Sequence, residues 1–140
     1  MKFTVYGIPK GKGRPKFTRQ GNFVRAYTPK ETLSYEQLVK FSYLEACNNN
    51  SQVLVGEVSM SIDAYFQIPK STSKKLKKIM IEEEKYHIKK PDIDNIIKSI
   101  LDGLNGVAFA DDNQVCRIMA TKRYAEVPRV EIEIRGELND

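Results

Sequence analysis

Five aspartates lie within a short stretch of the sequence, and their carboxylates are the side chains with the clearest capacity for chemistry. They are Asp92, Asp94, Asp102, Asp111 and Asp112. Carboxylates brought together repel one another, by about 4 kcal/mol for a pair about 4 Å apart at an effective dielectric constant of about 20. A cation offsets this repulsion, and an all-oxygen ligand set favours a hard cation such as Mg²⁺. The stretch therefore predicts a divalent-metal site.

The central part of this stretch is predicted to be an amphipathic helix from about residue 93 to 105. Its apolar residues recur at helical spacing and are expected to face the core: Ile96, Ile97, Ile100, Leu101 and Leu104. Asp94, Lys98 and Asp102 fall on the opposite side and form a polar stripe along about three turns. Asn105-Gly106 favours a left-handed end to the helix. The polar stripe is therefore expected to face something other than the core.

The second group of aspartates, Asp111-Asp112, follows this helix just before an apolar run that begins at Val115. If the chain folds back on itself, this pair comes near the start of the helix. Zinc is disfavoured as the metal, because the candidate ligands are all oxygens. Cys47 and Cys116 belong to no CxxC or Cys/His cluster and are expected to be reduced, buried thiols. His87 is the only histidine and gives weak support for histidine-based catalysis.

Four of the five aspartates also have a purely structural interpretation. Asp92 is placed to cap the helix, and Asp102 to pair with Lys98 four residues earlier. Asp111-Asp112 fits a solvated turn. Taken one at a time, these interpretations are favoured. Taken together, and with Asn95 beside the same aspartates, the five carboxylates favour a binding site.

Positive charge is concentrated in two other segments of this 140-residue chain, whose formal net charge is +5. Residues 1–30 carry five Lys and three Arg against no acid, and residues 70–90 carry eight Lys against three Glu. Residues 92–112 carry five Asp against one Lys. An acidic centre in a basic surround would steer a polyanion to the site, although lysine-rich surfaces also serve solubility.

Both basic segments are candidates for binding phosphates. Residues 10–16 combine glycines with four cations, so the backbone can approach a phosphate chain, but the Gly-Lys-Ser/Thr ending of a Walker motif is missing. Residues 70–84 predict a short basic helix, which fits either a mobile clamp for a polyanion or a solvated helix. The candidate DNA-binding residues are Lys10, Lys12, Arg14, Lys16, Lys74, Lys75, Lys77, Lys78, Lys89 and Lys90.

The remaining pattern predicts a single domain over residues 1–140. Strands are predicted at residues 2–8, 22–27, 57–67, 115–124 and 129–135, and a further helix at about 29–48. The last two strands are expected to form a terminal hairpin. No run approaches the roughly 18 apolar residues of a membrane span, and no apolar signal segment is present, so a cytoplasmic protein is expected.

Three motifs of this chain resemble those of the RusA-type Holliday junction resolvases. They read Lys-Pro-Asp-x-Asp-Asn-x-x-Lys, then Asp-x-Leu-Asn-Gly, then Asp-Asp-x-Gln-Val. The resemblance is strong over residues 89–115 and extends more loosely to the first strand, the basic loop with Arg14-Pro15 and the final strands. It implies an α/β (α+β) fold in which a mixed β-sheet packs against helices.

The resemblance also implies roles for individual residues. It assigns the metal ligands to Asp92, Asp94 and Asp112, with Asp111 as a further candidate, and it assigns the catalytic lysine to Lys98. It further implies Mg²⁺ or Mn²⁺ as the metal, a homodimer, four-way DNA junctions as the substrate and, often, a prophage gene.

Three functions are therefore compared. The first is a Mg²⁺-dependent endodeoxyribonuclease that resolves Holliday junctions by paired phosphodiester hydrolysis in DNA recombination and repair. The alternatives are a non-catalytic junction-binding or DNA-binding module and a metal-dependent nucleotide phosphohydrolase. A metal that lowers the pKa of a bound water would serve either hydrolase without a serine, cysteine or histidine nucleophile.

Overall fold

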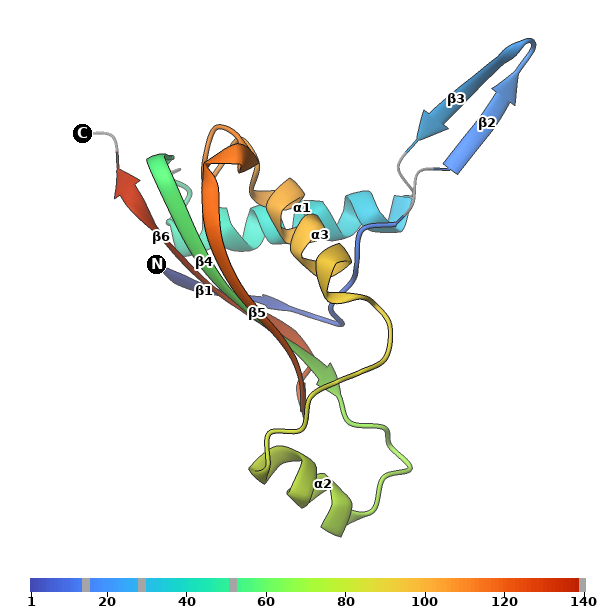
Figure 1. Ribbon diagram of the computed structural model, residues 1–140, viewed down its shortest axis with the longest axis vertical. Coiled ribbons are helices and arrows are strands. Elements are labelled where there is room, and N and C mark those ends of the chain that lie inside the picture. The colour runs from blue at the N-terminus through green and yellow to red at the C-terminus, as the bar shows by residue number, and fades with distance from the viewer. Residues whose placement is uncertain (14–15, 28–29, 51–52, 139–140) are drawn as a thin grey trace.

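The computed structural model describes residues 1–13, 16–27, 30–50 and 53–138 of the chain. Figure 1 shows a sheet with helices on one side, and a hairpin and a further helix that project from this body. The elements are β1 (Lys2–Tyr6), β2 (Lys16–Gln20), β3 (Phe23–Tyr27), α1 (Lys30–Ala46), β4 (Leu54–Gln67), α2 (Lys74–Glu82), α3 (Ile93–Leu104), the 3₁₀ turn η1 (Asp112–Gln114), β5 (Val115–Ala125) and β6 (Arg129–Leu138).

The main sheet has the strand order β1-β6-β4-β5. β4 pairs with β5 in parallel and with β6 antiparallel, and β6 pairs antiparallel with β1. The mixed sheet and its helices confirm the predicted α+β class. The chain passes from β4 through α2 and α3 before it returns as β5, because parallel neighbours need a crossover connection.

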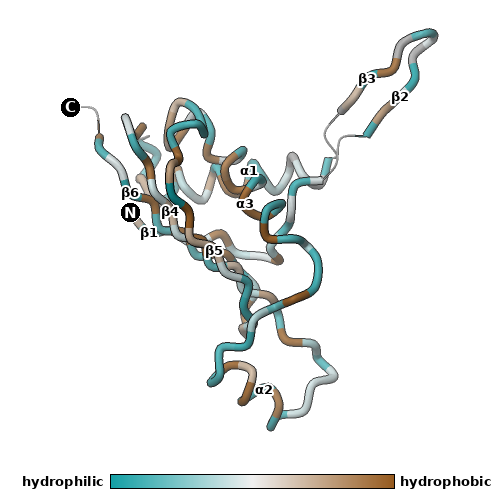
Figure 2. Tube along the Cα trace, in the orientation of Figure 1, coloured by the Kyte–Doolittle hydropathy of each residue, from teal (hydrophilic) through white to brown (hydrophobic). Residues whose placement is uncertain are grey.

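The core lies between one face of this sheet and the helices α1 and α3. Alternation along β4 directs Val58, Met60 and Ile62 toward the helices, where they are 0%, 4% and 1% exposed. Val39 and Tyr43 of α1 complete this layer. In Figure 2, brown apolar segments gather where the strands meet α3. The face of α3 that carries the apolar residues is therefore fixed by the core.

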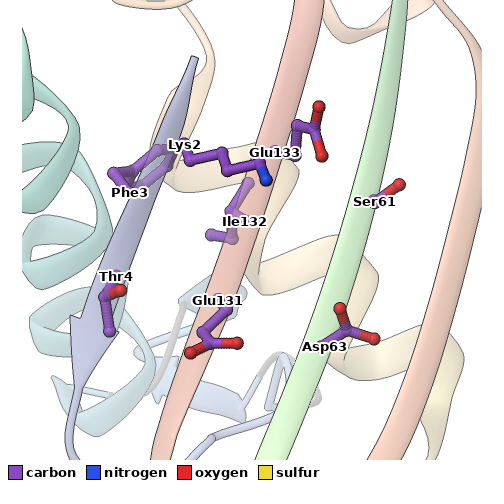
Figure 3. A pocket seen from close by; sticks show the side chains of 8 residues that line it. All are labelled: Lys2, Phe3, Thr4, Ser61, Asp63, Glu131, Ile132 and Glu133. Carbon is purple, nitrogen blue, oxygen red and sulfur yellow. The ribbon is translucent and has the colours of Figure 1, made fainter.

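The opposite face of the sheet is polar and, in the described residues, carries no helix. Figure 3 shows a shallow hollow on this face, with Asp63 of β4, Glu131 and Glu133 of β6 and Lys2 of β1 around it. None of the predicted site residues lines this hollow. The chemistry is therefore not expected here.

The predicted terminal hairpin of residues 115–124 and 129–135 is wrong. β5 and β6 follow each other in the chain, but β4 lies between them in the sheet. Residues 126–128 span two strand spacings of about 4.8 Å each, a distance that a few extended peptide links reach. Alternation along a strand indicates which side chains face the core but not which strand lies next to it.

The other elements differ from the predictions mainly at their ends. β4 begins at Leu54 rather than at residue 57, and α2 occupies Lys74–Glu82, with Ser73 as its N-cap, within the predicted range of residues 70–84. β2 was not predicted at all. It pairs with β3 in a separate two-stranded sheet. No helix among the described residues is long and apolar enough to cross a membrane. Cys47 is buried as expected, whereas Cys116, in β5 at the edge of the sheet, is exposed.

Candidate active site

Helix α3 is held against α1 and the sheet by its apolar side. Ile96, Ile100 and Leu104 are at most 1% exposed. Gly103 permits a close approach to α1, because a Cβ at this position would lie only 2.8 Å from the Glu36 carbonyl oxygen. With this side buried, the polar stripe of α3 lies on the outer surface, as predicted.

Asp92 and Asp94 stand at the N-terminal end of α3. Asp92 occupies the N-cap position with extended backbone, but its side chain makes no capping hydrogen bond, so the structural interpretation of its carboxylate is wrong. Asp94 lies in the first turn, and Lys98 lies one turn further. All three are exposed, and none takes part in an ion pair within the described part of the chain. These charges are available to a ligand.

Asp102 is bound to a different lysine from the one expected. Lys12 Nζ lies 3.1 Å from Asp102 Oδ2 and 2.6 Å from Glu36 Oε1, so it joins α3 to α1. Burial lowers the pKa of Lys12, but hydrogen bonds and charge from the two carboxylates outweigh burial and leave this pKa raised. The expected pair between Asp102 and Lys98 is not among the ion pairs of the described residues. Asp102 is therefore paired with Lys12, and Lys98 belongs to no ion pair among the residues that the structure describes.

Asp111 and Asp112 lie at η1, immediately before β5. The Asp111 carboxylate caps this turn by accepting a hydrogen bond from the Asn113 N–H at 3.2 Å. A hydrogen bond with Asp111 is the main cause that raises the pKa of Asp112. Asp102 raises it further, and Lys98 lowers it. The electrostatic partners of Asp112 on α3 are therefore Lys98 and Asp102, in the middle and at the end of the polar stripe, and not the aspartates at the helix start near which Asp112 was expected.

The carboxylates are not gathered into a ready-made metal cage. Over residues 1–13, 16–27, 30–50 and 53–138, no group of three or more His, Cys, Asp or Glu side chains is arranged to hold a metal ion. Mg²⁺ usually takes one or two protein carboxylates and completes its shell with waters and substrate phosphates. The oxygen donors of the exposed Asp92 and Asp94 and of the partly buried Asp112 fit a metal that binds together with its substrate.

Gln114 fixes the turn η1 to the sheet. Its Oε1 accepts hydrogen bonds from the Ala110 and Asp111 N–H groups at 2.9 and 3.2 Å. Its Nε2 donates to the carbonyls of Leu54 and Gly56, each at 3.1 Å. The sequence motifs did not reveal this role. The Asp-x-x-Gln spacing is that of a capping box and is the feature that indicates it.

The basic loop after β1 is fastened to the first turns of α3. The Lys12 N–H donates to the Asn95 carbonyl at 2.8 Å, and the Ser99 hydroxyl donates to the Lys10 carbonyl at 2.8 Å. An open depression of about 540 Å³ lies where the loop meets the helix. Its lining residues are Gly11, Lys12, Lys90, Pro91, Asp92 and Asn95. Asp92 therefore shares a surface with a glycine-containing basic loop.

The predicted DNA-binding residues are placed in different ways. Lys12 is engaged by its two carboxylates, and Arg14 lies outside the described residues. Lys10, Lys16, Lys89 and Lys90 are exposed. Helix α2 has no buried residue and projects from the body (Figure 1). It carries Lys74, Lys75, Lys77 and Lys78.

Comparison with known proteins identifies the family of this chain. The chain is similar to "Uncharacterized protein YqaN" of Bacillus subtilis (strain 168), with 36% identity over 138 residues that cover 96% of this chain and 95% of that protein. Residues 7–135, which include α3, η1 and the basic loop, match the family described as "Endodeoxyribonuclease RusA". The chain therefore belongs to the RusA endodeoxyribonuclease family.

Proposed function

We propose that this chain is a Mg²⁺-dependent endodeoxyribonuclease that resolves four-way (Holliday) DNA junctions during recombination and repair. The family supports the endodeoxyribonuclease activity. The main observation in support of metal-dependent chemistry is that the aspartates of this acidic surface differ in whether they have an ion-pair partner. Asp102 forms an ion pair with Lys12, whereas Asp92 and Asp94 are exposed without ion pairs in the described residues. In a purely structural cluster, every carboxylate would be expected to have such a partner.

We infer that Asp92, Asp94 and Asp112 hold the metal. Asp111 already caps η1, which makes Asp112 the stronger candidate of that pair. Carboxylate oxygens suit Mg²⁺ and also Mn²⁺. A divalent metal held by these carboxylates would lower the pKa of a bound water and polarise the scissile phosphate, and so would allow hydrolysis near neutral pH.

Lys98 supplies positive charge to the same surface. It lies one turn after Asp94 and within electrostatic reach of Asp112. In this position its ammonium group stabilises the negative charge that builds on the phosphate in the transition state, or it orients the attacking water. The ion pair between Lys12 and Asp102 supports this role, because it removes the partner that Lys98 would otherwise have four residues along the helix.

Branched DNA would contact the exposed lysines around this surface. Lys90 lines the depression that contains Asp92, the exposed Lys10 directly precedes the lining residue Gly11, and α2 presents its four lysines away from the body. A four-way junction is approximately two-fold symmetric, and resolution requires nicks in two strands of like polarity. One site per chain therefore calls for a homodimer, the commonest closed assembly.

The proposal is tested with a radiolabelled four-way junction, a linear duplex and free nucleotides, each incubated with and without Mg²⁺. The expected result is metal-dependent cleavage of the junction at paired, symmetric positions. Binding without cleavage in any divalent metal would instead identify a DNA-binding module. Hydrolysis of the nucleotides alone would identify a phosphohydrolase.

A further inference from the structure

The hairpin of β2 and β3 projects from the body of the molecule (Figure 1). Its strands are in register, with Phe17 opposite Ala26 and Arg19 opposite Val24. Residues directly opposite in an antiparallel pair share one face, and on this face Phe17 and Val24 are 70% and 67% exposed. A two-stranded hairpin by itself is only marginally stable in water. The exposed apolar side chains and the marginal stability of an isolated hairpin therefore indicate that this hairpin binds a partner.

The charge of the hairpin indicates what that partner is. Residues 16–27 contain Lys16, Arg19 and Arg25 and no acid. All three cations are exposed, and none belongs to an ion pair of the described residues. Arg19 Nε donates only within the turn, to the Gly21 carbonyl at 3.2 Å. Exposed cations without acidic partners complement a polyanion.

The base of the hairpin is tied to the candidate active site. Before β2, the Lys12 N–H donates to the Asn95 carbonyl of α3, and the Gly13 N–H donates to the Thr32 hydroxyl of α1 at 3.1 Å. Gly13 precedes Lys16, the first residue of β2, by three positions. The hairpin therefore starts beside the depression that contains Asp92 and extends outward from it.

We propose that this hairpin is an arm that lies along a duplex arm of the DNA substrate, with its strands in the major groove and its cations on the flanking phosphates. The proposal rests on the proposed function, because it assumes that DNA occupies the active site. The major groove admits a two-stranded β-ribbon, and apolar side chains there can contact thymine methyl groups. Strands of five residues reach about 17 Å, which corresponds to about five base pairs at about 3.4 Å each.

The test compares the double variant Arg19→Gln/Arg25→Gln with a control that loses the same charge elsewhere, Lys2→Gln/Lys40→Gln, whose lysines are exposed on β1 and α1. Junction binding is measured by fluorescence anisotropy over a salt series without divalent metal, so that no cleavage occurs. The hairpin variant should show a log–log salt slope reduced by up to about 2, because each lost phosphate contact accounts for about 0.9. The control should keep the slope of the original chain.

A hydroxyl-radical footprint provides the second measurement. The original chain should protect about five consecutive base pairs in a duplex arm beside the cleavage position, as the reach of the strands predicts, and the hairpin variant should lose this protection. Equal salt slopes in the two variants, or an unchanged footprint, would overturn the proposal that the hairpin is a DNA-binding arm. A hairpin variant whose free protein has a lower mass by light scattering would also overturn it and would indicate an arm between copies of the chain.

A cleavage assay distinguishes the failure of this inference from the failure of the proposed function. The hairpin variant should still cut the junction with Mg²⁺ at low salt, because none of the proposed metal ligands lies in β2 or β3. If it cuts normally and shows no change in slope, only the arm is wrong. If the original chain cuts no junction under any of these conditions, the proposed function itself fails.

Discussion

The five aspartates of the site differ in the partners that the fold gives them. Asp102 is paired with Lys12, and Asp111 caps η1. Asp92 and Asp94 have no such partner in the described residues, although Asp92 stands where a helix cap is common. The motifs could locate the acidic site, but they could not predict this division. The partner of Asp102 comes from a loop that is distant in sequence.

Asp94→Asn should reduce cleavage of the junction by at least about 100-fold, since groups that only orient metal ligands already contribute about 10- to 100-fold. Junction binding should be retained or tightened, because one repulsive charge is removed from a surface that meets phosphate. Cleavage and gel-shift assays measure the two effects. Glu126→Gln, which removes an exposed acid elsewhere, serves as the control. A folded Asp94→Asn protein that cuts normally would remove Asp94 from the metal ligands.

Lys12→Met should lower the free energy of unfolding by roughly 1–3 kcal/mol, because it leaves two partly buried carboxylates without their hydrogen-bond donor. The loss is measured by chemical denaturation. Lys40→Met, which changes an exposed lysine of α1, is the matched control and should have little effect. Equal stability of the two variants would show that the link between α1 and α3 through Lys12 is unimportant.

The turn η1 positions Asp112 through hydrogen bonds that run to the backbone of β4 and to the residues before the turn. The chain enters β5 directly after this turn, and β5 pairs with β4, so Asp112 is held by the same strand that organises the core. The position of Asp112 beside α3 therefore depends on Gln114 as well as on the aspartates themselves.

Gln114→Ala should reduce cleavage by about 10-fold or more, in the range expected for a group that orients a metal ligand. The reduction should appear mainly in kcat, because the DNA-binding lysines are unaffected. Asn113→Ala, a change to the exposed neighbour whose side chain makes no hydrogen bond in the described residues, should remain active. If both variants cleave equally well, Gln114 does not position Asp112.

His87 links the segment before α3 to β5 and makes stability depend on pH. Its ring stacks on Phe66 at 3.8 Å, and its backbone N–H donates to the Lys122 carbonyl at 2.8 Å. Burial is the main cause that lowers the pKa of His87 from 6.5, and Lys122 and Lys89 add to it. The unfolded chain therefore binds this proton more readily than the folded one, and stability falls as the pH drops below about 6.5.

His87→Phe keeps an aromatic ring against Phe66 and removes the titration. Between about pH 7 and pH 5, the range in which histidine titrates, the melting temperature of the original chain should fall further than that of the variant. Thermal unfolding followed by circular dichroism measures the difference. Parallel losses in the two proteins would assign the pH dependence to other groups.

The architecture of the molecule was only partly predictable from its sequence. Helix α3 and strand β4 were predictable because each buries one regular face, with periods of 3.6 and 2 residues. The order of the strands was not, because β4 lies between two strands that are consecutive in the chain. Strand β3 was predicted, at residues 22–27, but β2 escaped detection for a different reason. The side chains described in β2, at residues 16–19, are all exposed, and residues 16–20 carry no periodic pattern.

The proposed homodimer should appear by light scattering as a mass twice the 16.0 kDa of one chain. Each dimer should nick both strands of a supercoiled cruciform plasmid and so linearise it. Mixing the original chain with an excess of Asp94→Asn should convert the product from linear to singly nicked plasmid, because most active chains then have an inactive partner. A monomeric mass with DNA bound, or linear product that persists in the mixture, would contradict the dimer.

The position of β6 also bears on how the protein is made. β6 is the last strand of the described chain, yet it lies between β1 and β4 and is the strand with which β1 pairs. Domains generally fold as units while the ribosome adds about 5–20 residues per second. β1 leaves the ribosome early but cannot pair with β6 until residues 129–138 have been synthesised. The nascent chain is therefore kept from forming its finished sheet, and with it a complete nuclease, until synthesis has passed β6.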